Sequence, residues 1–226
     1  MPGRNVVLAT GEIYHIFNRG NAYRPTFLNI RDYQRFLKTL TFYRHLSLPL
    51  RLSKYLLLSQ EKRILLEDKL TEKDKSLVDI FCFCLMPNHY HLLLRQKEKE
   101  GISKYMSQLQ NSYTRYLNVK RKQVGSIFQG HFKAVRIETD EQLIHLSRYI
   151  HLNPYSSFVV KSIERLKTYP WSSLPDYSND GKHSFLKKRL ILDFFKNIED
   201  YQKFVFDQAD YQKNLEKIKH LTWEKK

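Results

Sequence analysis

The alternation of apolar and polar positions along the chain predicts strands and helices in turn. Residues 12–21 are rich in β-branched and aromatic side chains and end in a Gly-Asn turn, which predicts a strand. Residues 30–46 carry apolar side chains at helical spacing, and Asn29 stands where a helix N-cap is expected. Residues 51–76 keep a helical period but are dense in charge, so we expect a solvated helical insertion there.

The strongest strand signal lies in residues 77–96. Two apolar runs flank Pro87 and Asn88, which are residue types that favour turns. The pattern therefore predicts an antiparallel hairpin. Because both faces of this hairpin are largely apolar, we expect the pair to be central in a sheet.

The chain continues with a long predicted helix at residues 101–123, which has a basic end. Residues 126–139 predict another strand or extended stretch. A helix from residue 140 should stop before Pro154, because a proline drives the preceding residue out of the helical conformation. Charged helical segments are predicted from about residue 186 onward.

This order of elements predicts an α+β fold, in which helices pack against an antiparallel sheet as in RRM-like and ferredoxin-like proteins. We expect one domain over residues 10–155, with the helical insertion at about residues 50–76. Residues 156–226 then form a C-terminal extension, a loop followed by helices. A chain of 226 residues is long enough for one sizeable core.

The net charge of the chain favours a polyanionic partner. Lys and Arg number 39 against 23 Asp and Glu, which gives a net charge of +16. Half of it falls between Arg95 and Arg136, where ten cations and two Glu are interleaved with aromatic side chains. Proteins hold single strands with cations that bind the phosphates and with aromatic rings that stack on the unpaired bases. The alternative is a merely soluble basic protein.

Two features bear on the compartment. Cys82 and Cys84 are the only cysteines, and their spacing puts them on one side of a strand, too close in sequence for a normal disulfide. We interpret them as small buried side chains in a reducing cytoplasm. The N-terminal residues lack the apolar run of a signal peptide, and no stretch is long enough to span a membrane. We expect a cytoplasmic protein with no membrane partner.

Two histidines stand out in the hairpin, in the run MPNHYHLLL. Side chains alternate across a strand, so His89 and His91 should share one face and Tyr90 the other. Two imidazoles at this spacing can ligate one divalent ion and leave positions open for a substrate. The alternative is two half-buried histidines bonded to backbone or water, which the short motif alone favours.

The helix after the hairpin carries tyrosines that could act as nucleophiles. Tyr113 shares one face with Leu109 and Leu117, which predicts that it points at whatever this helix packs on. That could be the sheet that bears the histidines, although the spacing alone favours plain core packing. Tyr116 should lie more to the side. A tyrosine beside a metal-bound phosphate can attack as the phenolate.

Several motifs in order resemble a known family. They are MPNHYHLLL, SYTRYLN, GSIFQGHFKAV and RYIHLNPYSS, with YHIFNRGN before them and YPWSS after them. Together they span about Tyr14 to Trp171 and resemble the HUH-type single-tyrosine transposases of insertion sequences, above all the REP-associated tyrosine transposase branch. The resemblance implies an RRM-like domain with the histidine pair on its sheet.

The resemblance also implies an activity: a transposase-type DNA endonuclease and strand transferase that cuts single-stranded DNA next to hairpins. A tyrosine forms a 5′-phosphotyrosine link and leaves a 3′-hydroxyl, so the strand can be rejoined without ATP. Carried onto this chain, His89 and His91 become ligands of a divalent metal, Mg or Mn, and Tyr113 the nucleophile. The relatives' third ligand is a Gln four residues after the tyrosine. That position is Leu117 here, so we take Asn118 as the third ligand.

The expected DNA contacts come from the basic side chains around these motifs: Arg19, Arg115, Lys120, Arg121, Lys122 and Lys133. A favourable position at a helix C-terminus also explains some of them, and the two interpretations are compatible. The resemblance implies a prokaryotic, nucleoid-associated monomer or homodimer with no small-molecule substrate. Two alternatives stay open: a non-catalytic binder of single-stranded DNA or RNA, and a metal-dependent nuclease that uses water.

Overall fold

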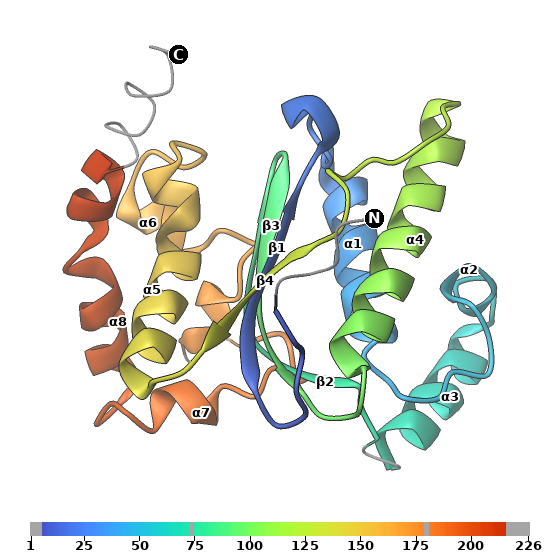
Figure 1. The fold of residues 1–226 in the computed structure, drawn as a ribbon, viewed down its shortest axis with the longest axis horizontal. Helices are drawn as coiled ribbons and strands as arrows, with labels where there is room; N and C mark the ends of the chain where they lie inside the picture. Colours follow the sequence, from blue (N-terminus) through green and yellow to red (C-terminus); the bar gives the residue numbers. More distant parts are fainter. Residues whose placement is uncertain (1–5, 73–74, 179–180, 216–226) are drawn as a thin grey trace.

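A four-stranded antiparallel sheet forms the centre of the protein (Figure 1). The structure is a computed structural model that describes residues 6–72, 75–178 and 181–215. The strands are β1 (Ile13–Arg19), β2 (Val78–Met86), β3 (His89–Gln96) and β4 (Lys133–Ile137). Their order across the sheet, β2-β3-β1-β4, is that of a ferredoxin-like domain, so the predicted fold class is confirmed.

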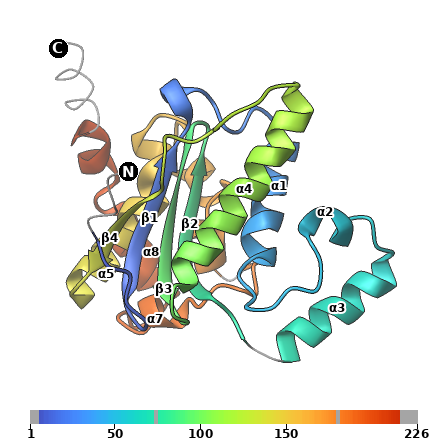
Figure 2. The same ribbon diagram turned by 45° about the vertical axis from the view of Figure 1, so that its right-hand side comes forward.

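One face of the sheet is covered by α1 (Ile30–Phe42) and α4 (Gly101–Arg121), which lie side by side (Figure 2). Their apolar faces and the inward side chains of the strands form the larger core. The expected cap of α1 is present, since the Asn29 side chain accepts a hydrogen bond from the Asp32 N–H at 3.2 Å. The predicted insertion is also helical, as α2 (Leu52–Tyr55) and α3 (Gln60–Glu72).

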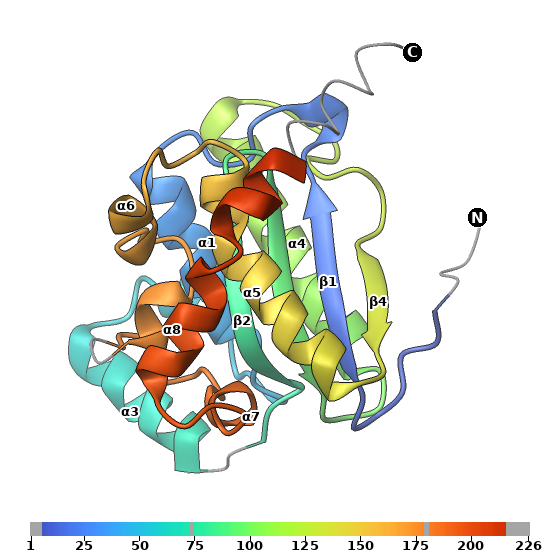
Figure 3. The ribbon, with the colours of Figure 1, turned by 90° about the vertical axis from the view of Figure 1, so that its left-hand side faces the viewer.

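The other face of the sheet is covered by α5 (Asp140–Ser156), which crosses it, and by α8 (Ile198–Phe206) outside it (Figure 3). The shorter elements of this layer are α6 (Ile163–Lys167), the 3-10 helix η2 (Leu174–Tyr177) and α7 (Arg189–Leu192). The prediction of helical segments after residue 186 is confirmed. Within the described residues, no helix is both long and apolar enough to cross a bilayer.

Two predicted boundaries are wrong. The helix that should stop before Pro154 runs on to Ser156, and Pro154 lies inside α5. Residues 153–156 are buried, so packing outweighs the local preference against helix before a proline. The strand predicted at residues 126–139 shortens to β4, because Gly130 has a φ of 54° and interrupts the extended backbone.

Only one strand of the predicted hairpin is central in the sheet. β3 lies between two strands, but β2 is an edge strand, although its side chains are buried along its whole length. The C-terminal extension covers that edge: the Leu85 N–H donates to the Trp171 carbonyl at 2.8 Å, and the Ser173 N–H to the Phe83 carbonyl at 2.9 Å. This cover pairs backbone groups that an open edge would expose, while the helices on each side bury the two apolar faces of β2.

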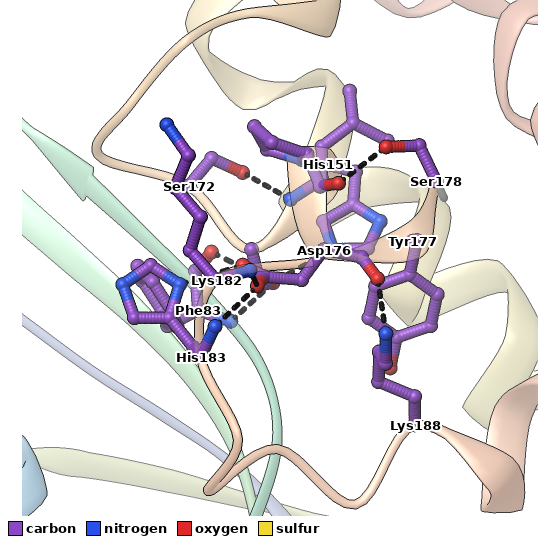
Figure 4. A network of polar contacts seen from close by, with 12 residues as sticks. Phe83, His151, Ser172, Asp176, Tyr177, Ser178, Lys182, His183 and Lys188 are labelled. Carbon is purple, nitrogen blue, oxygen red and sulfur yellow. Dashed lines mark hydrogen bonds and ion pairs between the residues drawn. The ribbon is translucent and has the colours of Figure 1, made fainter. Parts of the chain in front are cut away.

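A buried polar network ties the extension to α5 and to its own loop (Figure 4). The His151 ring contacts the Ser173 hydroxyl at 2.8 Å and the Tyr201 hydroxyl at 2.7 Å. Asp176 accepts hydrogen bonds from the Lys182 and His183 N–H groups and from the His183 ring. Burial would raise the pKa of Asp176, but the His183 side chain and these N–H groups hold it below its usual range.

We expect acid to destabilise the fold through His151. Burial lowers the pKa of His151 to about 3, so its ring is neutral in the folded state and protonates first in the unfolded chain. The contribution of neutral His151 to the free energy of unfolding is complete above the pKa of about 6.5 that the ring has in the unfolded chain. The contribution declines as the pH falls toward 3, by at most about 1.4 kcal/mol per pH unit. When urea unfolding is measured across this pH range, the free energy of unfolding should fall less steeply with decreasing pH for His151→Gln than for the wild type. Equal slopes would contradict the assignment.

Candidate active site

Two neighbouring strands bring histidines together on the face that α5 crosses. In the register of β1 and β3, Phe17 pairs with His91 and Arg19 with His89. Paired residues of antiparallel strands point to the same side of the sheet, and alternation adds His15 to that side. The prediction that His89 and His91 share a face is confirmed.

The imidazoles are linked by short contacts. His15 Nε2 lies 2.9 Å from His91 Nδ1, with the two rings stacked at 5.1 Å between centroids. The ring of His89 meets that of His91 edge-on, also at 5.1 Å, and its Nδ1 lies 2.7 Å from Asn88 Oδ1. Because an amide oxygen only accepts, His89 Nδ1 carries the proton and Nε2 presents its lone pair. The same arrangement follows for His91 if its Nδ1 donates to His15.

Burial keeps the rings of His15 and His91 neutral. Burial lowers the pKa of His15 to about 4. Burial also holds the pKa of His91 well below its usual value, with further lowering by His15, His89 and Arg19. Neutral imidazoles can act as metal ligands, whereas protonated ones cannot.

Helix α5 adds a tyrosine and an amide to this cluster. The ring of Tyr149 stands edge-on to His91, at 5.6 Å between centroids, and to His15 at 6.3 Å. One helical turn later, Asn153 Nδ2 lies 3.5 Å from His91 Nε2. Residues four apart lie on the same face of a helix, so α5 presents both groups to the histidines.

Tyr113, in contrast, lies on the other face of the sheet. Its side chain is fully buried against the rings of Phe27 and Phe36, and its hydroxyl donates to the Thr26 carbonyl at 2.8 Å. Burial raises the pKa of Tyr113. Its helix does pack on the sheet, as predicted, but on the face of Tyr90, whose hydroxyl accepts from Gln110 of α4. The structure therefore does not bring Tyr113 together with the histidines.

The other predicted residues of α4 also lie away from the histidines. The Asn118 side chain donates to the Gly125 carbonyl at 2.9 Å and accepts from Gln123. Lys120 bonds to Asp32 on α1, and Arg115 and Lys122 are exposed along the end of the helix. These contacts close the end of α4 and do not reach the sheet face that bears His91.

Two predicted cations do lie nearer to the histidines. Arg19 is paired with His89 in the sheet, and Lys133 is paired with Phe17 on the same face. Both side chains are exposed. Arg121 reaches from α4 toward the Pro25 and Thr26 carbonyls, at 3.4 and 3.5 Å.

A pocket of about 240 Å³ opens beside Tyr149, between α5 and the C-terminal residues 208–215. Arg148, Tyr211 and Gln212 are among its lining residues. The tyrosine is thus half-buried between the histidines on one side and a surface hollow on the other.

The fold and the site define a class: a ferredoxin-like domain whose sheet carries an H-x-H pair and whose covering helix faces that pair with a tyrosine. Over residues 54–153 the chain matches the family of IS200-like transposases, so the resemblance inferred from the motifs is confirmed. The matched segment contains the histidine pair, Tyr113 and Tyr149. Transposases of this family act on DNA.

One solved structure supports the fold. It is that of a REP-associated tyrosine transposase bound to a REP hairpin, 14% identical in sequence, with a TM-score of 0.55. The match covers 83% of this chain and 98% of the other. The comparison with curated proteins finds no match.

The sequence interpretation missed Tyr149, Asn153 and His15. A signal for the first two was present, because Asn153 stands four residues after Tyr149, where the relatives have their Gln. The same position after Tyr113 is Leu117. The expectation that the helix ends before Pro154 concealed this spacing. His15 alternates with Phe17 and Arg19, but only the pairing of β1 with β3 brings it to His91.

Proposed function

We propose that this protein cuts and rejoins single-stranded DNA by forming a covalent bond between Tyr149 and a 5′-phosphate. The observation that carries the proposal is the edge-on contact of Tyr149 with His91, with Asn153 one turn further along the same helix. A tyrosine beside a pair of neutral imidazoles has what a metal-assisted nucleophile requires. The proposal moves the nucleophile from Tyr113 to Tyr149.

The residues present fit a divalent metal ion. The Nδ1 contact of His89 leaves the Nε2 lone pair for a metal, and His91 offers its Nε2 in the same way when its Nδ1 donates to His15; this arrangement is typical of metal-bound histidines. The described residues contain no group of three or more His, Cys, Asp or Glu side chains suited to a metal, so we propose the side-chain oxygen of Asn153 as the third ligand. The amide nitrogen of the same side chain lies 3.5 Å from His91 Nε2, which places Asn153 beside the histidines. When bound, the ion would polarise the scissile phosphate and offset its developing charge.

The chain's own groups account for the rest of the step. The Tyr149 oxygen bonds to the phosphorus and gives up its proton to solvent. The bond from phosphorus to the 3′-oxygen breaks, and that oxygen takes a proton to become a 3′-hydroxyl. His15 holds the ring of His91 through the 2.9 Å contact and so fixes its orientation. Reversal with another 3′-hydroxyl rejoins the strand.

The substrate we propose is a DNA hairpin with single-stranded flanks. The solved relative is bound to a REP hairpin, and this chain has a net charge of +16. Arg19 and Lys133 lie on the face of the histidines and would contact the cut strand. Arg115, Lys120, Arg121 and Lys122 at the end of α4 would contact the phosphates of the stem. One chain supplies both Tyr149 and the histidines, which supports a monomer.

The test is a denaturing gel. The protein would be mixed with labelled single-stranded hairpins from the DNA that flanks its own gene, with and without Mn or Mg. A protease-sensitive, metal-dependent adduct would support the proposal. Free fragments without an adduct would indicate water as the nucleophile, and binding without any cleavage would favour a non-catalytic binder.

The identity of the third metal ligand can be tested separately, because two asparagines, Asn153 and Asn118, are candidates for it. We expect Asn153→Ala to weaken Mn binding and metal-dependent cleavage by about 10- to 100-fold. Asn118→Ala should leave both unchanged, since its amide contacts Gly125 and Gln123. Titration of Mn by electron paramagnetic resonance measures the affinity directly. The reverse order of the two variants would return the role to Asn118.

A further inference from the structure

The turn between β1 and α1 is fixed in place beside the histidine face. The Gly20 N–H donates to the Asn88 carbonyl at 2.6 Å and the Asn21 N–H to the Ile127 carbonyl at 2.7 Å. Gly20 is required there, since a Cβ atom would lie 2.1 Å from the Arg24 carbonyl oxygen. Tight packing of backbone on backbone gives this turn one conformation.

The turn holds Tyr23 outward at some conformational cost. Ala22 and Tyr23 have φ values of 50° and 59°, in the left-handed region that residues with a side chain seldom adopt. The Tyr23 side chain gains no burial in return, because 56% of its surface is exposed. A strained backbone that presents a large ring to solvent is a pattern typical of binding sites.

Cations lie along the turn that carries this ring. The guanidinium carbon of Arg19 lies 5.0 Å from the centre of the Tyr23 ring. Arg24 is the next residue and is exposed, and Arg121 reaches the Pro25 and Thr26 carbonyls from α4. The turn therefore combines an exposed aromatic ring with positive charge for phosphates.

The turn is also connected to the histidines. Asn88 Nδ2 donates to the Tyr23 carbonyl at 3.3 Å, while Asn88 Oδ1 accepts from His89 Nδ1 at 2.7 Å. One amide thus contacts both the Tyr23 backbone and a proposed metal ligand. A strand whose phosphate lies at His89 would pass this ring with a neighbouring nucleotide.

We propose that Tyr23 is a stacking platform for one unpaired base of the DNA strand, next to the phosphate that is cut. The inference rests on the proposed function, because it takes a single-stranded DNA substrate as given. Stacking is tolerant of sequence, since every base has a π face. Tyr23 would therefore position the strand and set its register, and it would take no part in the bond-breaking step.

The experiment measures binding of a labelled DNA hairpin with short thymidine flanks, by fluorescence anisotropy in chelator so that the strand is not cut. Tyr23→Ala should weaken binding about tenfold, and Tyr23→Phe should bind like the wild type, because the phenyl ring still stacks. Phe158→Ala is the matched control, since Phe158 is also 48% exposed with a φ of 59° and a lysine over its ring. It should bind normally.

A second series replaces the flank bases one at a time with abasic nucleotides. At one position the wild type should lose about tenfold in affinity, while Tyr23→Ala should lose nothing further there. Any of three results would overturn the platform. They are additive losses of affinity at every position, unchanged binding by Tyr23→Ala, and an equal loss of affinity in Phe158→Ala. Adduct formation by the wild type with metal tests the proposed function separately. A wild type that binds no hairpin would overturn both proposals.

Discussion

Replacing Tyr149 with phenylalanine is expected to abolish the covalent adduct while hairpin binding stays intact. The change removes one oxygen, the atom that would bond to phosphorus, and keeps the ring that packs on His91 and His15. Loss of a nucleophile costs at least about a thousandfold in rate, because no other group in the site takes over the covalent step. The measurement is the amount of protease-sensitive adduct on a denaturing gel, beside the affinity from anisotropy.

The matched control is Tyr113→Phe, which removes the same atom on the other face of the sheet. It should cost about 1 kcal/mol of stability, the worth of the hydrogen bond to the Thr26 carbonyl, and leave adduct formation within about twofold. Adduct lost in Tyr113→Phe and kept in Tyr149→Phe would restore the assignment based on the sequence motifs. Adduct kept in both variants would rule out both tyrosines.

The two tyrosines show what local pattern can and cannot predict. The positions of the two helices were predictable, because apolar side chains recur at helical spacing in both. The face of Tyr113 along α4 was predictable as well, and it is buried in the core that α1 and α4 form with the sheet. Which face of the sheet α4 covers depends on how β1, β2 and β3 pair, and no local pattern contains that long-range information.

The strand β3 illustrates the opposite case. Period-two alternation alone placed His89 and His91 on one side and Tyr90 on the other, and the structure agrees. The error lay one step later, in the assignment of Tyr113 to the face of the histidines. His15 was out of reach for a similar reason, since it lies 76 residues from His91 in sequence and 2.9 Å from it in space.

The C-terminal extension was predicted only as loop and helices, and its structural role follows from the edge of β2. The apolar residues of β2 gave no sign of whether a strand or another segment would cover them. In the structure, residues 171–173 bond along that edge, while η2 and α8 build the second core with α5. The extension thereby supports α5, the helix that carries Tyr149 and Asn153.

Replacing His91 with alanine is expected to remove metal-dependent cleavage and leave the fold and hairpin binding in place. His91 contacts His15 on one side and Asn153 on the other, so its loss removes the central donor of the proposed site. The rate of cleavage should fall at least about 100-fold. Loss of a residue that only contacts a metal ligand already lowers metal affinity or activity by up to about 100-fold, and His91 is itself a proposed ligand. Mn titration by electron paramagnetic resonance should show that the ion is no longer bound.

His45→Ala serves as the control for removal of a histidine. Burial lowers the pKa of His45 to about 4, as for His15, but its backbone pairs with Ser76 beside the helical insertion, away from α5. This variant should bind Mn and form the adduct like the wild type. If His91→Ala still bound Mn, or if the wild type still cut DNA in chelator, the metal role would be wrong. Tyr149 would then have to be activated by the neighbouring imidazoles alone, with His91 and His15 as the candidates for the base.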